Sequence, residues 1–111
     1  MPLSDSSHSE LLKAVLLPLL DDFLYWFERS HQLLDHQPIA FLSADAQADL
    51  LARVQRAQQE VRTAKLLFEA TDGKVGIEST VLEPWHLLVT ECWQIAARVR
   101  MAQSLEYRED S

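Results

Sequence analysis

Apolar residues recur at three- and four-residue steps in three long stretches of the chain, which is the spacing of amphipathic helices. In the first stretch, from about Ser9 to about Asp35, two adjacent apolar rows form one wide stripe. The rows are Leu12, Leu16, Leu19, Phe23, Trp26 and Leu33, with Leu17, Leu20, Leu24 and Phe27 beside them. Pro18 lies inside this stretch. Because proline removes a backbone hydrogen bond and clashes with the preceding turn, we predict a kink or a split near Pro18.

The second stretch predicts a helix from about Ala44 to about Ala70. Ser43 precedes it and is a favourable N-cap, since its hydroxyl can accept from a free backbone N–H of the first turn. The apolar positions alternate four- and three-residue steps, which is a heptad seam. They are Leu50, Val54, Ala57, Val61, Ala64 and Phe68. Gly73 follows the helix and is predicted to adopt the left-handed cap conformation.

The third stretch begins with a capping-box pattern, Thr80-x-x-Glu83, and places Pro84 in the first turn of the helix. We predict that this helix extends to about Tyr107. Its seam is formed by Trp85, Leu88, Cys92, Ile95, Ala96, Val99 and Ala102. A loop is expected at residues 74–79, where the sequence has two closely spaced glycines.

Together these patterns predict an all-α fold, an antiparallel three-helix bundle with heptad-like seams, because short connections make successive helices antiparallel. The chain has 111 residues, which is the size of one domain. We expect a flexible leader at residues 1–8, a single helical domain at residues 9–107 and a flexible tail at residues 108–111.

The charge of the chain excludes some classes of binding partner. The chain has 10 basic and 17 acidic residues and a net charge of −7. Because a protein that follows nucleic-acid phosphates needs a basic face, we expect no nucleic-acid partner. The most apolar stretch is interrupted by charged residues, so we expect no transmembrane segment. The lone Cys92 favours a reducing, cytoplasmic location.

Four aromatic residues within five positions give the most informative local pattern: Phe23, Tyr25, Trp26 and Phe27. Successive residues of a helix are rotated by about 100°, so these rings cannot all face one core. Some of them must contact a connection, a second subunit or another protein. Tyrosine and tryptophan are enriched in the most strongly binding positions of interfaces, so we predict a partner interface here. The intrachain alternative is that the apolar connection at residues 39–42 covers the rings.

A second aromatic group is a candidate for binding a small ligand. Trp85 and His86 begin the third helix, and Cys92 and Trp93 follow two turns later on the same helix. In the ligand-binding hypothesis these four side chains line a pocket. The alternative is structural: a cysteine on the apolar seam is usually a small buried hydrophobe, and a histidine near a helix start is usually packed or capped.

Two Glu-x-x-His pairs, Glu28 with His31 and Glu83 with His86, have the spacing that carboxylate-bridged metal sites use in helical bundles. Residues at i and i+3 share one helix face and can bind one metal centre. In an up-down-up bundle, however, the two pairs lie at opposite ends. Glu83 is also explained by the capping box, so a metal site is the weakest of the functional hypotheses.

Several segments resemble a short family of unknown function that is restricted to cyanobacteria. The most specific of these segments are Pro84-Trp85-His86 and Glu91-Cys92-Trp93. The others include residues 10–13, 18–23, 25–30, 41–43, 48–54 and 70–76. The resemblance covers about residues 10–100 and implies a cyanobacterial, cytoplasmic protein. It implies no activity and supplies no catalytic residue.

From the sequence we therefore expect a non-enzymatic module for protein–protein interaction or assembly, which binds itself or another protein. A bundle that binds a small ligand or cofactor is the alternative, and a metalloenzyme is the third hypothesis. We expect no cofactor. The pattern favours interaction because it contains apolar surface in excess of one small core and no polar constellation typical of catalysis.

Overall fold

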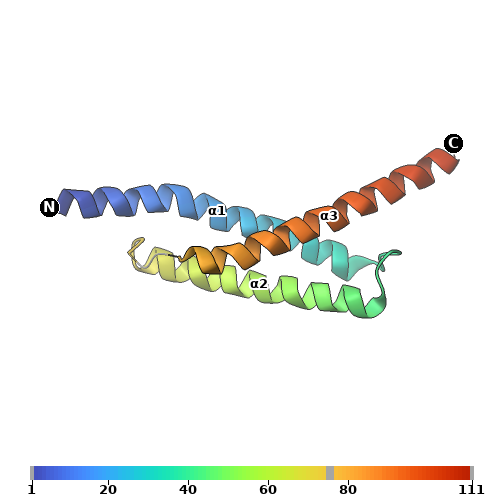
Figure 1. Ribbon diagram of the computed structural model, residues 1–111, viewed down its shortest axis with the longest axis horizontal. Helices are drawn as coiled ribbons and strands as arrows, with labels where there is room; N and C mark the ends of the chain where they lie inside the picture. The colour runs from blue at the N-terminus through green and yellow to red at the C-terminus, as the bar shows by residue number, and fades with distance from the viewer. Residues whose placement is uncertain (1, 75–76, 111) are drawn as a thin grey trace.

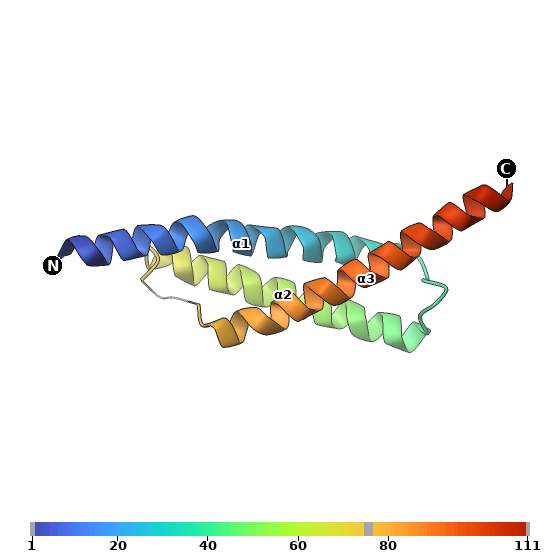
Figure 2. The same cartoon turned by 45° about the horizontal axis from the view of Figure 1, so that its top comes forward.

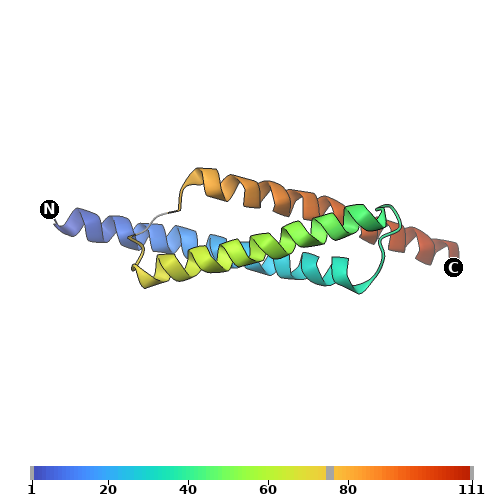
Figure 3. The same cartoon turned by 90° about the horizontal axis from the view of Figure 1, so that it is seen from below.

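A computed structural model describes residues 2–74 and 77–110, and within these ranges the chain forms three helices and no strand. The helices are α1 (Pro2–His36), α2 (Ala44–Ala70) and α3 (Ser79–Asp110). α1 packs against both α2 and α3, so the predicted all-α three-helix bundle is confirmed. Figure 1 and Figure 3 show that α2 runs antiparallel to α1 and α3. Met1, residues 75–76 of the predicted loop and Ser111 of the predicted tail lie outside the described residues.

α1 is longer than its apolar pattern predicted. It begins at Pro2 instead of near Ser9, and it continues without a break through Pro18. The helix is therefore not split. Figure 1 shows that α1 changes direction within its N-terminal half and remains helical there. A bend without a break is what one interior proline produces when the turns on either side keep their hydrogen bonds.

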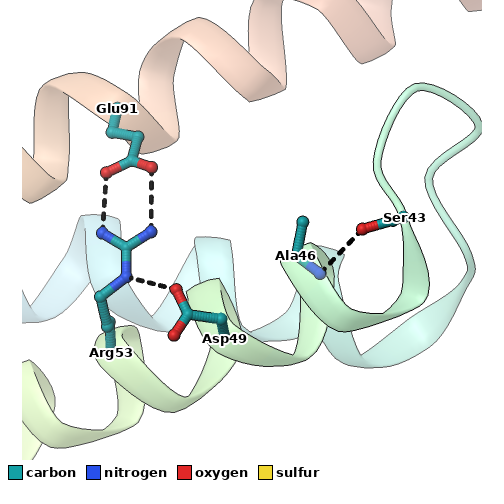
Figure 4. Close-up of polar contacts among 5 residues, drawn as sticks. All are labelled: Ser43, Ala46, Asp49, Arg53 and Glu91. Atoms are coloured by element: carbon teal, nitrogen blue, oxygen red, sulfur yellow. Dashed lines mark hydrogen bonds and ion pairs between the residues drawn. The ribbon is translucent and has the colours of Figure 1, made fainter.

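The two ends of α2 are capped by different hydrogen-bond patterns. At the N-terminus the Ser43 hydroxyl accepts a hydrogen bond of 3.0 Å from the Ala46 N–H, which confirms the predicted cap (Figure 4). At the C-terminus Gly73 donates to the Phe68 carbonyl at 2.8 Å, and Asp72 donates to the Glu69 carbonyl at 3.1 Å. This pair of bonds is a Schellman motif.

In this motif the first left-handed residue is Asp72 (φ 56°), and Gly73 (φ 80°) follows it. Gly73 thus has the positive φ that the sequence predicted, and Asp72, which was not predicted to do so, adopts a positive φ before it. Aspartate is one of the few residues other than glycine that tolerate this conformation. The Asp72 carboxylate also forms an ion pair with Lys13 of α1, which lowers the pKa of Asp72. This contact ties the end of α2 to α1.

The start of α3 differs from the predicted capping box. The helix begins at Ser79, and the Val81 N–H donates to the Glu78 carbonyl at 3.0 Å. The Thr80 hydroxyl donates a hydrogen bond of 3.3 Å to the carboxylate of Glu78, the residue before the helix. It therefore does not cap the N-terminus of α3 as predicted. Because the helix starts earlier than predicted, Pro84 lies inside α3 and not in its first turn.

All three helices and the connection after α1 contribute to the core. The seam predicted for α2 is buried at every position except Ala64, which is half-buried. The predicted seam of α3 extends too far, since Ala102 is exposed where the helix leaves the bundle. The largest buried hydrophobic residues outside α2 are Leu16, Leu20, Phe23, Phe27, Leu34, Ile39, Trp85 and Val89.

Two sets of polar side-chain contacts hold the helices and the α1–α2 connection in place. The Gln47 side chain closes the α1–α2 connection: its Oε1 accepts from the Ile39 N–H at 2.8 Å, and its Nε2 donates to the Leu34 and Gln37 carbonyls at 2.8 and 2.9 Å. Arg53 of α2 joins α3 through two parallel hydrogen bonds of 2.9 and 3.0 Å to the Glu91 carboxylate (Figure 4). The fork geometry of the guanidinium suits this pairing, which raises the pKa of Arg53 above its ordinary value.

The molecule is much more elongated than a compact domain of its size. It measures 67 × 29 × 19 Å and has a radius of gyration of 18.1 Å, whereas a compact chain of this length has a radius of about 13 Å. Figures 1 and 2 show the cause: α1 extends beyond the bundle at one end, and α3 extends beyond it at the other. In these projecting segments His8, Glu10 and Leu11 of α1 and residues 100–106 of α3 are exposed.

Candidate binding groove between α1 and α3

The structure separates the four clustered aromatic residues of α1 into two pairs. Phe23 and Phe27 are buried, and their rings stack with centroids 6.1 Å apart. Tyr25 is 52% exposed, and Trp26 is half-buried. The predicted interface is therefore corrected for Phe23 and Phe27, which a partner cannot reach in this fold. The surface that remains available consists of Tyr25 and Trp26.

Trp26 lies at the edge of a groove that separates α1 from α3. Its ring meets that of Trp93 edge to face, with centroids 5.5 Å apart. The groove has a volume of about 390 Å³, which lies within the range of pockets that bind small ligands. Its lining residues are Trp26, Arg29, Ser30, Leu33, Cys92, Trp93, Ala96, Val99, Arg100 and Gln103. The floor is mostly apolar, and the charged groups that line it are two guanidinium groups.

The charge of this groove is opposite to that of the whole chain. Arg29 and Arg100 line it, and none of the acidic residues that the structure describes does. Arg29 contacts the Tyr25 hydroxyl at 3.0 Å, and neither arginine forms an ion pair with any of the described residues. In a chain with a net charge of −7, this is a local positive site beside the half-buried Trp26 and the exposed Trp93. Such a site favours a ligand or partner that combines apolar surface with negative charge.

The second predicted group, Trp85 with His86, Cys92 and Trp93, is only partly brought together. Trp85 is buried in the core, where its ring meets Phe23 edge to face at 5.8 Å. His86 is exposed, and its ring lies 6.0 Å from that of Phe23. Neither lines the groove, whereas Cys92 and Trp93 do. A pocket at this place therefore uses Trp26 and Leu33 of α1 in place of Trp85 and His86.

Cys92 forms part of the floor of the groove and is almost completely buried. Burial raises the pKa of its thiol, the nearby Glu91 charge acts in the same direction, and a hydrogen bond with Ser30 opposes them. The thiolate, which is the reactive form, is therefore disfavoured in the folded chain. This agrees with the structural interpretation of Cys92 as a small buried hydrophobe.

We expect Cys92 to react with a thiol reagent at least about tenfold more slowly in the folded protein than in urea at the same pH, because burial both blocks access and disfavours the thiolate. The absorbance of released thionitrobenzoate at pH 8 measures this rate, and equal rates in the folded and unfolded states would contradict the burial of Cys92.

The raised pKa of the Cys92 thiol also sets the sign of the pH dependence of the free energy of unfolding. This thiol stabilises the fold below the ordinary cysteine pKa, and its contribution falls as the pH rises towards the folded-state value.

Glu28 and His31, the first candidate metal pair, are joined by a glutamine of α2. Gln58 is 3% exposed. Its Nε2 donates to Glu28 Oε2 at 2.9 Å, and its Oε1 lies 2.9 Å from His31 Nδ1. His31 Nε2 lies 3.4 Å from Gln55 Nε2, so the neutral tautomer with hydrogen on Nδ1 satisfies both contacts. The pair thus takes part in a network between α1 and α2, which the sequence pattern did not reveal.

The second candidate pair, Glu83 and His86, is exposed near the start of α3. Within residues 2–74 and 77–110, no three histidine, cysteine, aspartate or glutamate side chains are grouped closely enough to hold a metal ion. The structure therefore does not bring the two Glu-x-x-His pairs into one such group. In the same described ranges, no helix has the length and apolar content required to cross a bilayer.

The geometry defines an elongated three-helix bundle with a positively charged aromatic groove between α1 and α3. A family model described as Protein of unknown function (DUF2605) matches residues 6–101, so the chain belongs to that family. No curated protein and no solved structure matches the chain. The resemblance to a family of unknown function is thereby confirmed, and its restriction to cyanobacteria stays a prediction.

Proposed function

We propose that this chain is a non-enzymatic module for protein–protein interaction or assembly, and that it binds its partner through the groove between α1 and α3. The main support is the amount of exposed surface. The chain exposes 7918 Å², whereas a compact monomer of 12.7 kDa exposes about 6,200 Å². The excess of about 1,700 Å² is larger than the roughly 800 Å² that each partner contributes to a stable interface.

The composition of the groove gives further support. Tryptophan and arginine are the residue types that most often dominate the binding energy of interfaces. The groove carries two of each: Trp26 and Arg29 from α1, and Trp93 and Arg100 from α3. Trp93 is 44% exposed, which is unusual for so large an apolar ring without a partner. A bound helix would cover both tryptophans and place its own charges beside the arginines.

Affinity purification with matched variants tests this proposal. Tagged wild-type chain, Trp93→Ser and Leu87→Ser are used as baits in extracts of cells that express the chain naturally. Leu87 is exposed on α3 and does not line the groove, so its variant is a control for lost apolar surface. We expect proteins retained by the wild type and by Leu87→Ser to be lost with Trp93→Ser, as measured by quantitative mass spectrometry. Identical protein sets for all three baits would contradict the proposal.

The groove volume supports a second candidate, the binding of a small ligand with an apolar body and an anionic group. About 390 Å³ accommodates such a molecule, and the guanidinium groups of Arg29 and Arg100 suit a carboxylate or phosphate. Mass spectrometry of the intact purified protein under native conditions distinguishes the candidates. A bound small molecule that is absent from Trp93→Ser favours the ligand, and its absence from the wild type favours the interaction module.

A further inference from the structure

We infer that the groove between α1 and α3 receives the N-terminal segment of α1 from a second copy of this chain, in an antiparallel, reciprocal dimer. This inference rests on the proposed function and names the partner. It follows from three observations: both terminal segments project beyond the bundle, they project at opposite ends, and the N-terminal segment is acidic whereas the groove is lined by two arginines.

The projecting segments are defined by the last contacts at each end. Lys13 forms its ion pair with Asp72 in the turn that ends α2, so residues 2–12 extend past that turn. We call residues 2–12 the N-terminal overhang. At the other end the Arg98 guanidinium lies 4.0 Å from the centre of the Phe41 ring, in the connection between α1 and α2. Residues 100–110, the C-terminal overhang, extend past it.

Several apolar side chains in or next to the overhangs are exposed. Leu11 of the N-terminal overhang is 63% exposed, and Val15, one turn further along α1, is exposed as well. Met101 and Leu105 of the C-terminal overhang are also exposed. A helix segment of about ten residues is marginal in water without tertiary packing. A neighbour that covers both overhangs therefore stabilises the conformation that the chain adopts.

The charge of the N-terminal overhang is opposite to that of the groove. Residues 1–12 contain two acidic residues, Asp5 and Glu10, and no lysine or arginine. The groove is lined by Arg29 and Arg100 and, among the residues that the structure describes, by no acidic residue. The C-terminal overhang beyond the groove is mixed in charge, with Arg108 beside Glu106, Glu109 and Asp110, so the attraction is directed to the groove. Glu10 shares Lys13 with Asp72, so one ammonium group faces two carboxylates and the Glu10 carboxylate stays largely exposed. An approaching Glu10 is therefore attracted to the arginines of the groove.

Symmetry selects the antiparallel arrangement. Figures 1, 2 and 3 place the N-terminus and the C-terminus at opposite ends of the long axis. If a second copy is turned end over end about a two-fold axis perpendicular to the long axis, each N-terminal overhang meets the other copy's groove, and the dimer is closed. The alternative of groove against groove would bring together Arg29 and Arg100 of both copies. Within the described part of the chain, no acidic residue lines the groove to offset that repulsion.

Charge reversal tests this inference on the full chain. Multi-angle light scattering over a dilution series measures the mass of wild type, Arg100→Glu, Glu10→Arg, the double variant Glu10→Arg/Arg100→Glu and Arg62→Glu. Arg62 is an exposed arginine of α2 outside the groove, so its variant is the control for net charge. Circular dichroism checks that each variant remains helical.

We expect the wild type and Arg62→Glu to be dimers of about twice 12.7 kDa. Each single reversal at the groove is expected to weaken the dimer about tenfold, since every contact occurs twice in a two-fold interface, and the double variant is expected to recover. A wild-type monomer at all concentrations overturns the inference, and so does a dimer that neither reversal weakens. Both outcomes leave the proposed interaction function to be decided by the affinity purification.

Discussion

Phe27→Ala is expected to lower the free energy of unfolding by about 3–5 kcal/mol, the cost of removing a phenyl ring from a packed core. Phe27 has no exposed surface, stacks on Phe23 and belongs to the central cluster that joins the three helices. Its removal leaves a cavity that rigid neighbouring helices fill only in part. Urea denaturation followed by circular dichroism at 222 nm measures the change.

Tyr25→Ala is the matched control, because Tyr25 lies in the same turn of α1 and is exposed. It loses an edge-to-face contact with Trp26 and a hydrogen bond from Arg29, both at the surface. We expect a cost of about 1 kcal/mol or less. If Phe27→Ala were as mild as Tyr25→Ala while the helical signal persisted, Phe27 would be a surface residue and the division of the aromatic cluster would be wrong.

Trp85→Ala is expected to cost about 3–5 kcal/mol as well. The indole is buried between α3 and α1, where it contacts the Phe23 ring, and it anchors the first half of α3 to the bundle. A residue whose role is to hold a ligand affects stability little when the ligand is absent, so the same urea experiment separates the structural role from the ligand-binding role.

Leu87→Ala provides the comparison for Trp85, since Leu87 lies two residues further along α3 and is exposed. We expect its free energy of unfolding to change by no more than about 0.5 kcal/mol, because alanine is also a strong helix former. Equal stabilities of the Trp85→Ala variant and the wild type would show that the start of α3 is not anchored through this ring.

Periodicity was sufficient to predict the helices and the seam of α2. That seam is regular because a helix packed along its whole length against neighbours must present apolar residues at each turn. The ends of α1 and α3 were harder to predict, since both helices continue past the core and the apolar repeat there has nothing to pack against. Ala102, a predicted seam residue, illustrates this: it is exposed because α3 has left the bundle.

The candidate site was predictable only in part. The pattern indicates that four neighbouring aromatic residues of α1 cannot share one core, but it does not reveal which of them face inward, because that depends on where α2 and α3 pack. Trp93 was predicted to take part in ligand binding, whereas Arg29 and Arg100 were missed. Two arginines far apart in the sequence form one positive site only after α1 and α3 are placed side by side.

The glutamines were also missed. Gln58 is buried among Glu28 and His31, and Gln47 closes the α1–α2 connection. A glutamine on a helix is common on any solvent-exposed face, so nothing in the pattern distinguishes these two. Their importance comes from the groups that they bind in a neighbouring element: Gln47 binds backbone groups at the end of α1 and in the connection, and Gln58 binds the side chains of Glu28 and His31.

The Gln47 bonds also bear on the order in which the chain acquires its structure. They connect groups that are close in sequence, so the hairpin of α1 and α2 can close at little cost in loop entropy. α3 packs mainly against α1, through residues far away in the sequence. During synthesis on the ribosome, the hairpin is therefore expected to assemble while α3 is still emerging from the exit tunnel, and α3 docks last.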